Sequence, residues 1–147
     1  MKILIINGPN LNLLGKRNKQ LYGDLSLNKI ESLLKKEFPK SIIELFQSNH
    51  EGEIIEKIQN AAKVYDALII NPGGYAHTSV AIRDALTECS IIKIEVHLSN
   101  LASREKFRQV MLTASVCDGY ICGFKENSYL AALYLVQKLK IKKRGKI

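Results

Sequence analysis

Short apolar runs rich in β-branched residues alternate along this chain with segments whose apolar residues recur every three or four positions, the spacing of a helix. Strands are expected over residues 2–6, 42–46, 67–70, 91–96 and 116–121, and helices over residues 27–38, 54–65, 82–89 and 128–139. A helix between successive strands is the usual connection of a parallel sheet. The alternation therefore predicts one three-layer α/β domain, with a five-stranded parallel sheet between two layers of helices.

The length and composition suit one globular domain, with 147 residues of which 46% are hydrophobic and 24% charged. No apolar run approaches the ~20 residues of a membrane-spanning helix, and the first apolar run ends after Ile6, too early for a secretory signal. Cys89, Cys117 and Cys122 stand in apolar stretches without a CxxC motif, which favours structural thiols over a disulfide or a metal site. These features predict a soluble, cytoplasmic protein.

The net charge of +8 is concentrated at the carboxyl end of the chain. Residues 138–147 hold six of the 22 basic residues and no acid, which leaves 16 basic and 14 acidic residues, a net charge of +2, for residues 1–137. We interpret residues 1–137 as a single domain and residues 138–147 as a flexible basic tail. Because no aromatic residues interleave with these basic residues, a solubilising tail is favoured over a contact with nucleic acid or membrane.

The segment that follows the first expected strand, residues 7–24, is long for a strand-to-helix connection, which usually takes ~2–6 residues. Gly15 and Gly23 bracket a polar stretch that contains Arg17 and Tyr22. Such a stretch could close over a ligand as a flap hinged at the two glycines. A solvated surface loop explains the same residues, and their types alone favour that simpler interpretation.

A second polar loop, residues 71–79, follows the third expected strand and reads NPGGYAHTS. Its glycines allow close backbone approach, and the N–H groups at the start of the next helix, which Thr78 and Ser79 can cap, favour an anion or a polar oxygen. The loop contains neither a GxxxxGK(S/T) phosphate loop nor a GxGxxG motif. His77 is compatible with a ligand contact and with a buried, hydrogen-bonded histidine.

The fourth expected strand ends in IEVHLSN, where Glu95 and His97 are two residues apart and so face the same side. A carboxylate beside an imidazole fixes its tautomer and stabilises its protonated form, as a general acid requires. An ordinary salt bridge is an equally good interpretation of the pair alone. Most charges in the following segment, 103–108, are expected on a solvated face, although Arg108 could reach back toward a carboxylate ligand.

Loops at the carboxyl ends of parallel strands form the ligand crevice in folds of this kind. Here they contain a tyrosine near an arginine, a histidine near a glutamate, and several amides. The sequence has no Ser/Cys–His–Asp nucleophile signature and no carboxylate cluster of the kind that holds magnesium. The set favours proton transfer on a small, polar, anionic molecule.

Four motifs carry a resemblance to a known family: GPNLNLLGKR…YG, NPGGYAHTS, EVHLSN with RExFR, and GFKENSYLAAL. In this order, and over nearly the whole chain except the basic tail, they resemble the type II 3-dehydroquinate dehydratases. The resemblance implies a flavodoxin-like doubly wound fold, homotrimers that assemble into a homododecamer, and neither a metal nor an organic cofactor. It also implies the anti elimination of water from 3-dehydroquinate through an enolate, which gives 3-dehydroshikimate in the shikimate pathway of aromatic amino-acid biosynthesis.

The same resemblance implies roles for individual side chains. Tyr22 matches the base that removes the proton next to the ketone, and Arg17 matches the residue that favours the tyrosinate. Asn10 matches the amide that helps to hold a water near the enolate. His97 matches the acid that protonates the departing hydroxyl, with Glu95 as its partner. Contacts to substrate are expected from Asn71, His77, Leu98, Ser99 and Arg108, and from Asp84 across the trimer interface.

The dehydratase is therefore the leading hypothesis from the sequence. The alternative is a non-catalytic flavodoxin-like module that binds a nucleotide or a flavin, which the lack of a phosphate loop and of any tryptophan disfavours. The chain departs from the family pattern in two places. Asn18-Lys19 stand where members often carry Glu-Pro, which predicts a more mobile flap, and Ala102-Ser103 stand where many carry His-Ala, which predicts a different substrate affinity.

Overall fold

A five-stranded parallel sheet forms the centre of the molecule, in a computed structural model that describes residues 1–144 and the side chains as far as residue 140. The strands are β1 (Lys2–Asn7), β2 (Ile42–Gln47), β3 (Ala67–Asn71), β4 (Ile92–His97) and β5 (Gly119–Cys122). Their order is β2-β1-β3-β4-β5, and every pair is parallel. The chain leaves β1 toward one edge and returns to β3 on the other side, so the point where the winding reverses lies between β1 and β3. The predicted parallel, flavodoxin-like sheet is confirmed.

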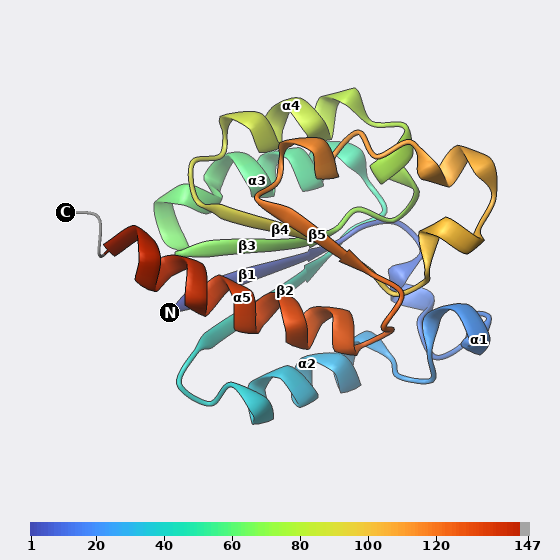
Figure 1. The fold of residues 1–147 in the computed structure, drawn as a ribbon, viewed down its shortest axis with the longest axis horizontal. Helices are drawn as coiled ribbons and strands as arrows, with labels where there is room; N and C mark the ends of the chain where they lie inside the picture. Colours follow the sequence, from blue (N-terminus) through green and yellow to red (C-terminus); the bar gives the residue numbers. More distant parts are fainter. Residues whose placement is uncertain (145–147) are drawn as a thin grey trace.

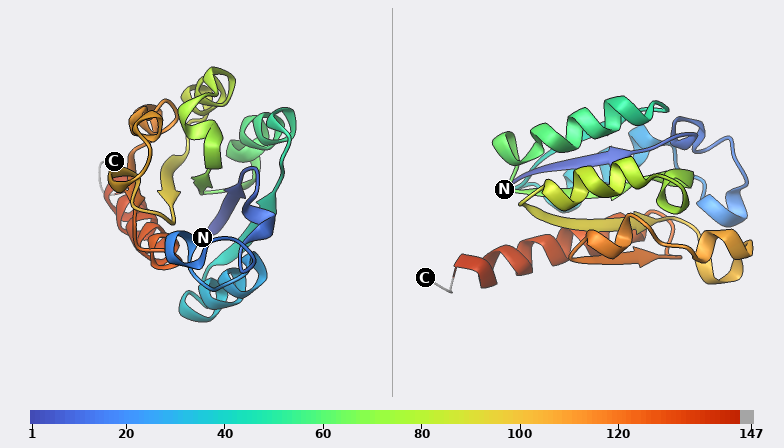
Figure 2. Two further views of the ribbon diagram at one scale, coloured as in Figure 1. Left: turned by 90° about the vertical axis from the view of Figure 1, so that its right-hand side faces the viewer. Right: turned by 90° about the horizontal axis from the view of Figure 1, so that it is seen from above.

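Two helices cover each face of this sheet (Figures 1 and 2). They are α2 (Leu27–Glu37) and α5 (Asn127–Arg144) on one face, and α3 (Glu51–Val64) and α4 (Val80–Glu88) on the other. Ile3 and Ile5 of β1 pack against the first pair, whereas Leu4 and Ile6 pack against the second, because successive strand residues point to opposite faces. All four side chains are fully buried, which explains why the first strand reads as a continuous apolar run.

Short helical turns fill the connections at the carboxyl end of the sheet, on the right of Figure 1. They are η1 (Leu11–Leu13), α1 (Lys19–Tyr22), η2 (Gly73–His77), η3 (Leu101–Ser103) and η4 (Lys106–Gln109). Ser26 caps α2 through a hydrogen bond from the Lys29 N–H at 3.3 Å, and Ser79 caps α4, as predicted, through one from the Ile82 N–H at 2.9 Å. The polar loops of the sequence are therefore ordered turns gathered at one end of the molecule.

Most element boundaries differ by one to three residues from those predicted, and the end of the last helix differs by five. The fifth strand begins at Gly119 and not at residue 116, because η5 (Ala114–Val116) comes first. Asp118, just before the strand, donates its N–H to the Lys93 carbonyl and accepts a hydrogen bond from the Lys93 N–H at its side-chain Oδ2. The last helix continues to Arg144 and not to residue 139, since no glycine or proline interrupts it before Gly145.

The predicted flexible tail, residues 138–147, therefore begins inside a helix. Lys140 forms an ion pair with Asp66, and Gln137 one turn earlier donates a hydrogen bond to Ser41 at 3.3 Å. Both contacts attach this part of α5 to the body of the domain. Residues 145–147 lie outside the described residues.

The helices described within residues 1–144 include none that is long and apolar enough to cross a membrane. Cys89, Cys117 and Cys122 are free thiols. Burial raises the pKa of the Cys117 thiol to about 12, so this side chain remains neutral and behaves as a small packing residue.

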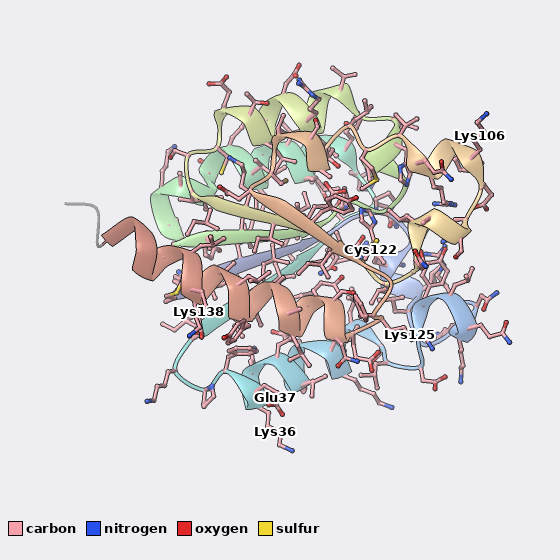
Figure 3. The ribbon with its side chains drawn as sticks, in the orientation of Figure 1. Lys36, Glu37, Lys106, Cys122, Lys125 and Lys138 are labelled. Carbon is pink, nitrogen blue, oxygen red and sulfur yellow. The ribbon has the colours of Figure 1, made fainter. Side chains whose placement is uncertain are left out.

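Lys125, in the connection between β5 and α5 (Figure 3), has a left-handed backbone with φ 51°. This conformation costs an L-residue roughly 1–2 kcal/mol, whereas glycine adopts it readily. We expect Lys125→Gly to raise the free energy of unfolding by about 0.5–1 kcal/mol and the Tm by about 1–4 °C. Thermal and urea unfolding would measure both. Gly123→Ala is the matched opposite, because Gly123 has φ 95° and an added Cβ would lie 3.2 Å from Asn100 Cβ. A lower Tm in Lys125→Gly would contradict the assignment of strain to this residue.

Candidate active site

A pocket opens at the carboxyl ends of β1, β3 and β4, beside the point where the winding of the sheet reverses. It is lined mainly by polar side chains, which suits a small polar ligand. Nine of the eleven site residues expected from the sequence line it, namely Asn10, Arg17, Tyr22, Asn71, His77, His97, Leu98, Ser99 and Arg108. Of the other two, Glu95 lies directly behind His97, and Asp84 lies elsewhere.

The loops after β1 and β3 meet at Gly8, and this contact brings the first two motifs together. The Gly8 N–H donates to the Asn71 carbonyl at 2.8 Å. A Cβ on Gly8 would lie 2.4 Å from the carbonyl oxygen of Pro72, so only glycine fits there. Asn10 follows with φ 68°, a left-handed conformation that asparagine tolerates, and its N–H donates to Asn49 Oδ1 at 3.0 Å.

Tyr22 ends the short helix α1, which lies between the two glycines of the expected flap. Gly15 and Gly23 have φ of 88° and 85°, so each makes a turn that other residues disfavour. The Asn18 side chain caps α1 by accepting hydrogen bonds from the N–H groups of Gln20 at 3.0 Å and Leu21 at 3.3 Å. Asn18, one of the departures from the family pattern, thus supports the helix that carries Tyr22.

The Tyr22 hydroxyl lies between two arginines. Arg17 Nη2 and Arg104 Nη1 each donate to it at 3.1 Å. The Arg17 guanidinium also lies over the Tyr22 ring, with Cζ 4.1 Å from the ring centroid. Two positive charges directed at one phenolic oxygen stabilise negative charge on that oxygen, so the geometry suits a phenolate base.

Arg104 is the main site residue that the sequence analysis missed. The expectation of a solvated face for the charges of residues 103–108 is wrong for Arg104, whose side chain is 9% exposed and which also donates to Ser99 Oγ at 3.0 Å. It is correct for Lys106, which points outward from η4 (Figure 3). The segment forms separate 3₁₀ turns and not one helix, so helical spacing gave no guide to which arginine faces the pocket. The RExFR motif, whose arginines are Arg104 and Arg108, was the sequence signal that could have identified Arg104 as a site residue.

Glu95 and His97 form a hydrogen-bonded pair at the pocket. His97 Nε2 lies 2.6 Å from Glu95 Oε1, as the two-residue spacing predicted. The Glu95 side chain is fully buried, and its other oxygen, Oε2, accepts a hydrogen bond from Thr113 Oγ1 at 2.5 Å. A carboxylate held by hydrogen bonds on both oxygens fixes the orientation and the tautomer of the imidazole beside it. Nδ1 of His97 remains for a ligand, which suits a general acid.

His77 provides a second imidazole, whose ring lies nearly parallel to that of His97 with centroids 6.1 Å apart. Burial lowers the pKa of His77, and the nearby charges of His97 and Arg108 lower it further, against the hydrogen bond to Val110. Its Nδ1 lies 2.7 Å from the Val110 carbonyl oxygen, which accepts a hydrogen bond from the N–H of the neutral ring. Nε2 is then a free acceptor for a ligand hydroxyl.

Asn71 is held at the floor of the pocket by the backbone and by α5. Its Oδ1 accepts a hydrogen bond from the Gly73 N–H at 3.2 Å, and its Nδ2 donates to the hydroxyl of Tyr129 at 3.1 Å. The Tyr129 hydroxyl in turn donates to Asn7 Oδ1 at 2.5 Å. Burial raises the pKa of Tyr129, so its hydroxyl stays protonated. The hydroxyl therefore accepts a hydrogen bond from Asn71 and donates one to Asn7. Tyr129 belongs to the last motif, GFKENSYLAAL, but the spacing of that motif gave no indication of this contact.

Asp84 does not line the pocket of its own chain. It lies on the outer surface of α4, where its side chain is 64% exposed and its Oδ1 lies 3.3 Å from Arg83 Nη1.

Arg108 lines the pocket and pairs with Glu105, with Nε 2.8 Å from Oε2. Among the side chains described, no three of histidine, cysteine, aspartate or glutamate are grouped in a way that could hold a metal ion.

One pocket thus holds a phenol that accepts hydrogen bonds from two guanidinium groups and an imidazole paired with a buried carboxylate. A doubly wound α/β protein with this site is an acid–base enzyme acting on a small polar molecule. The chain belongs to the dehydroquinase class II family, whose sequence model matches residues 1–137.

Named relatives and solved structures agree with this family. The chain is 48% identical over 140 residues to a 3-dehydroquinate dehydratase of Caldanaerobacter subterraneus, covering 94% of this chain and 95% of the relative. It is 50% identical over 141 residues to one of Clostridium perfringens, covering 94% and 97%. The type II dehydroquinase structure from Butyrivibrio crossotus matches with a TM-score of 0.90 and 46% identity, over 93% of this chain and 97% of that one. The one from Propionibacterium acnes matches with a TM-score of 0.87 and 34% identity, over 92% and 96%.

Proposed function

We propose that this chain catalyses the dehydration of 3-dehydroquinate to 3-dehydroshikimate, the type II reaction of the shikimate pathway that leads to aromatic amino acids. Relatives named for this activity share about half of the sequence over nearly the full length of both chains. The observation that carries the proposal is the Tyr22 hydroxyl held at 3.1 Å from both Arg17 and Arg104, in the same pocket as the His97–Glu95 pair. The enzyme is a hydro-lyase.

In the first step, the phenolate of Tyr22 removes a proton from the carbon next to the ketone. The electron pair of the broken C–H bond moves onto the ketone oxygen and gives an enolate. The positive charges of Arg17 and Arg104 stabilise the negative charge on the phenolate oxygen. Asn10, at the edge of the pocket, helps to hold a water near the enolate oxygen.

In the second step, His97 gives its proton to the hydroxyl group that leaves. The enolate electrons return to form the conjugated double bond while the C–O bond breaks, and the hydroxyl departs as water. Glu95 stabilises the imidazolium before this transfer and fixes the ring nitrogen that faces it. After these steps Tyr22 holds one extra proton and His97 has lost one. Tyr22 releases its proton to solvent and His97 takes one up, which restores both groups.

The remaining pocket residues bind and orient the substrate. Asn71 and His77 contact its hydroxyl groups, while Leu98, Ser99 and Arg108 contact its polar and carboxylate oxygens. Arg108 suits the carboxylate because a guanidinium can bind it with two hydrogen bonds. Closure of the segment between Gly15 and Gly23 excludes water from the reacting atoms.

The enzyme acts in the cytoplasm as homotrimers that assemble into a homododecamer, and Asp84 reaches the pocket of a neighbouring copy. The free cysteines favour a reducing compartment, and Asp84 is exposed on a helix whose first residue, Val80, is an exposed apolar side chain. Native mass spectrometry would distinguish a monomer, a trimer and a dodecamer. Asp84→Ala would weaken substrate binding only if the copies associate.

The activity has a direct assay. Incubation of the purified protein with 3-dehydroquinate should produce the ultraviolet absorbance of the conjugated enone, at a rate proportional to enzyme concentration. A binding module for a nucleotide or flavin would produce no such signal and would retain its ligand through purification. Absence of turnover by the folded protein would overturn the proposed function.

A further inference from the structure

The segment of residues 110–113 runs behind both imidazoles of the pocket. The Val110 carbonyl oxygen accepts a hydrogen bond from His77, with Nδ1 at 2.7 Å, and the Leu112 N–H donates at 2.9 Å to the carbonyl of Ala76, the residue before His77. Thr113 Oγ1 donates to Glu95 Oε2 at 2.5 Å. We call residues 110–113 the backing segment. It contacts His77 directly and His97 through Glu95, and none of its residues lines the pocket.

Thr113 is the member of the backing segment that bonds a charged group. Both Thr113 and Glu95 are fully buried, so water cannot replace the Thr113 hydroxyl at Oε2 of Glu95. A carboxylate can only accept hydrogen bonds, so the hydroxyl of Thr113 must be the donor. The two oxygens of Glu95 are thus divided between Thr113 and His97.

We propose that Thr113 is a positioning residue for the acid of the reaction, whose hydroxyl keeps Glu95 ionised and oriented so that the shared proton resides on His97. The inference rests on the proposed function, because it assigns a determinant of proton donation by His97. Thr113 acts through Glu95 and does not touch the substrate.

Other ionisable groups lie near the Glu95–His97 pair. His77 faces His97 from η2, and Arg104, Arg108 and Tyr22 line the same pocket from other elements. Cys117, whose Sγ donates to the Thr113 carbonyl at 3.5 Å, remains a neutral thiol because burial raises its pKa to about 12. Within residues 1–140, Thr113 is the side chain that satisfies Oε2.

The sign of the effect follows from the states of the pair. Without the Thr113 hydroxyl, the Glu95 anion loses a donor, whereas the protonated carboxyl form loses little. The shared proton therefore shifts from His97 toward Glu95, and the pair releases it to solvent only at higher pH. The same shift leaves less imidazolium to protonate the departing hydroxyl.

Thr113→Val removes the hydroxyl and keeps the size of the side chain. We expect kcat to fall about 10-fold or more, KM to change less than about 2-fold, and the alkaline limb of the kcat–pH profile to move to higher pH. Thr113→Ser should restore the rate and the profile, since it keeps the donor. Ser115→Ala, which removes an exposed hydroxyl bonded to the Leu112 carbonyl at 2.7 Å in the following turn, should match the wild type.

A titration that needs no turnover separates this inference from the proposed function. In ¹H–¹⁵N spectra of the free protein, the His97 imidazole of Thr113→Val should titrate at higher pH than that of the wild type. An unmoved or lower midpoint would overturn the role of Thr113, even in a wild-type protein without activity. An active wild type with unchanged kcat in Thr113→Val would overturn it as well. Thr113→Ala compared with Thr113→Ser gives the same test if the valine variant does not fold.

Discussion

Tyr22→Phe should lower kcat by roughly 10²–10⁴-fold, because it removes the oxygen on which Arg17 and Arg104 converge and with it the proposed base. The ring and its contact with the Arg17 guanidinium remain, so the short helix α1 should stay in place. Steady-state assays that follow the enone absorbance would give kcat and KM. Substrate binding relies on other pocket residues, so KM should change far less than kcat.

Tyr134→Phe is the matched control for this prediction. Tyr134 lies on α5 with 54% of its surface exposed and away from the pocket, so loss of its hydroxyl should leave kcat unchanged. Circular dichroism and thermal unfolding of both variants would confirm that neither change disturbs the fold. A Tyr22→Phe enzyme that retains more than a tenth of the wild-type kcat would exclude Tyr22 as the base.

The secondary structure could be predicted because its signals are local. The strands that are buried on both faces, such as the one from Lys2 to Asn7, appear as apolar runs, and the helices that cover the sheet show one apolar side. The fifth strand was predicted to begin too early because Val116 and Cys117 are apolar, although both residues precede the strand. They pack against the α3–α4 side of the sheet in the turn that precedes the strand.

The site was predictable in part for a topological reason. Parallel strands end at the same edge of the sheet, so the loops after β1, β3 and β4 had to converge, and most expected side chains line one pocket. Composition and spacing reached only a proton-transfer site. The particular roles of Tyr22 and His97 depended on the resemblance to the family.

The residues that the sequence analysis missed are supports whose partners are distant in the chain. Arg104 and Tyr22 are 82 residues apart, and Tyr129 and Asn7 are 122 apart. Thr113 reaches Glu95 across 18 residues, from a turn with no periodic pattern. A local pattern carries no information on which polar side chain turns inward, because that choice is made when the tertiary structure closes over the buried group.

Glu95→Gln should lower kcat by roughly 10²–10³-fold, because the amide keeps the shape of the carboxyl group and removes the negative charge beside His97. Without that charge the imidazolium is less stable, so His97 releases its proton at lower pH. The alkaline limb of the kcat–pH profile should therefore move to lower pH, which is opposite to the shift expected for Thr113→Val. The profile of each variant against that of the wild type would measure both shifts.

The opposite signs distinguish a defect in proton donation from a general loss of structure. If either substitution merely loosened the pocket, both profiles would keep the wild-type limb and differ only in amplitude. Glu31→Gln is the matched control, because Glu31 pairs with Lys35 on the outer surface of α2 and its loss should leave the profile unchanged. A Glu95→Gln enzyme with an unmoved alkaline limb would mean that the Glu95 charge does not control the proton on His97, and the acid would then have to be sought among the other groups of the pocket.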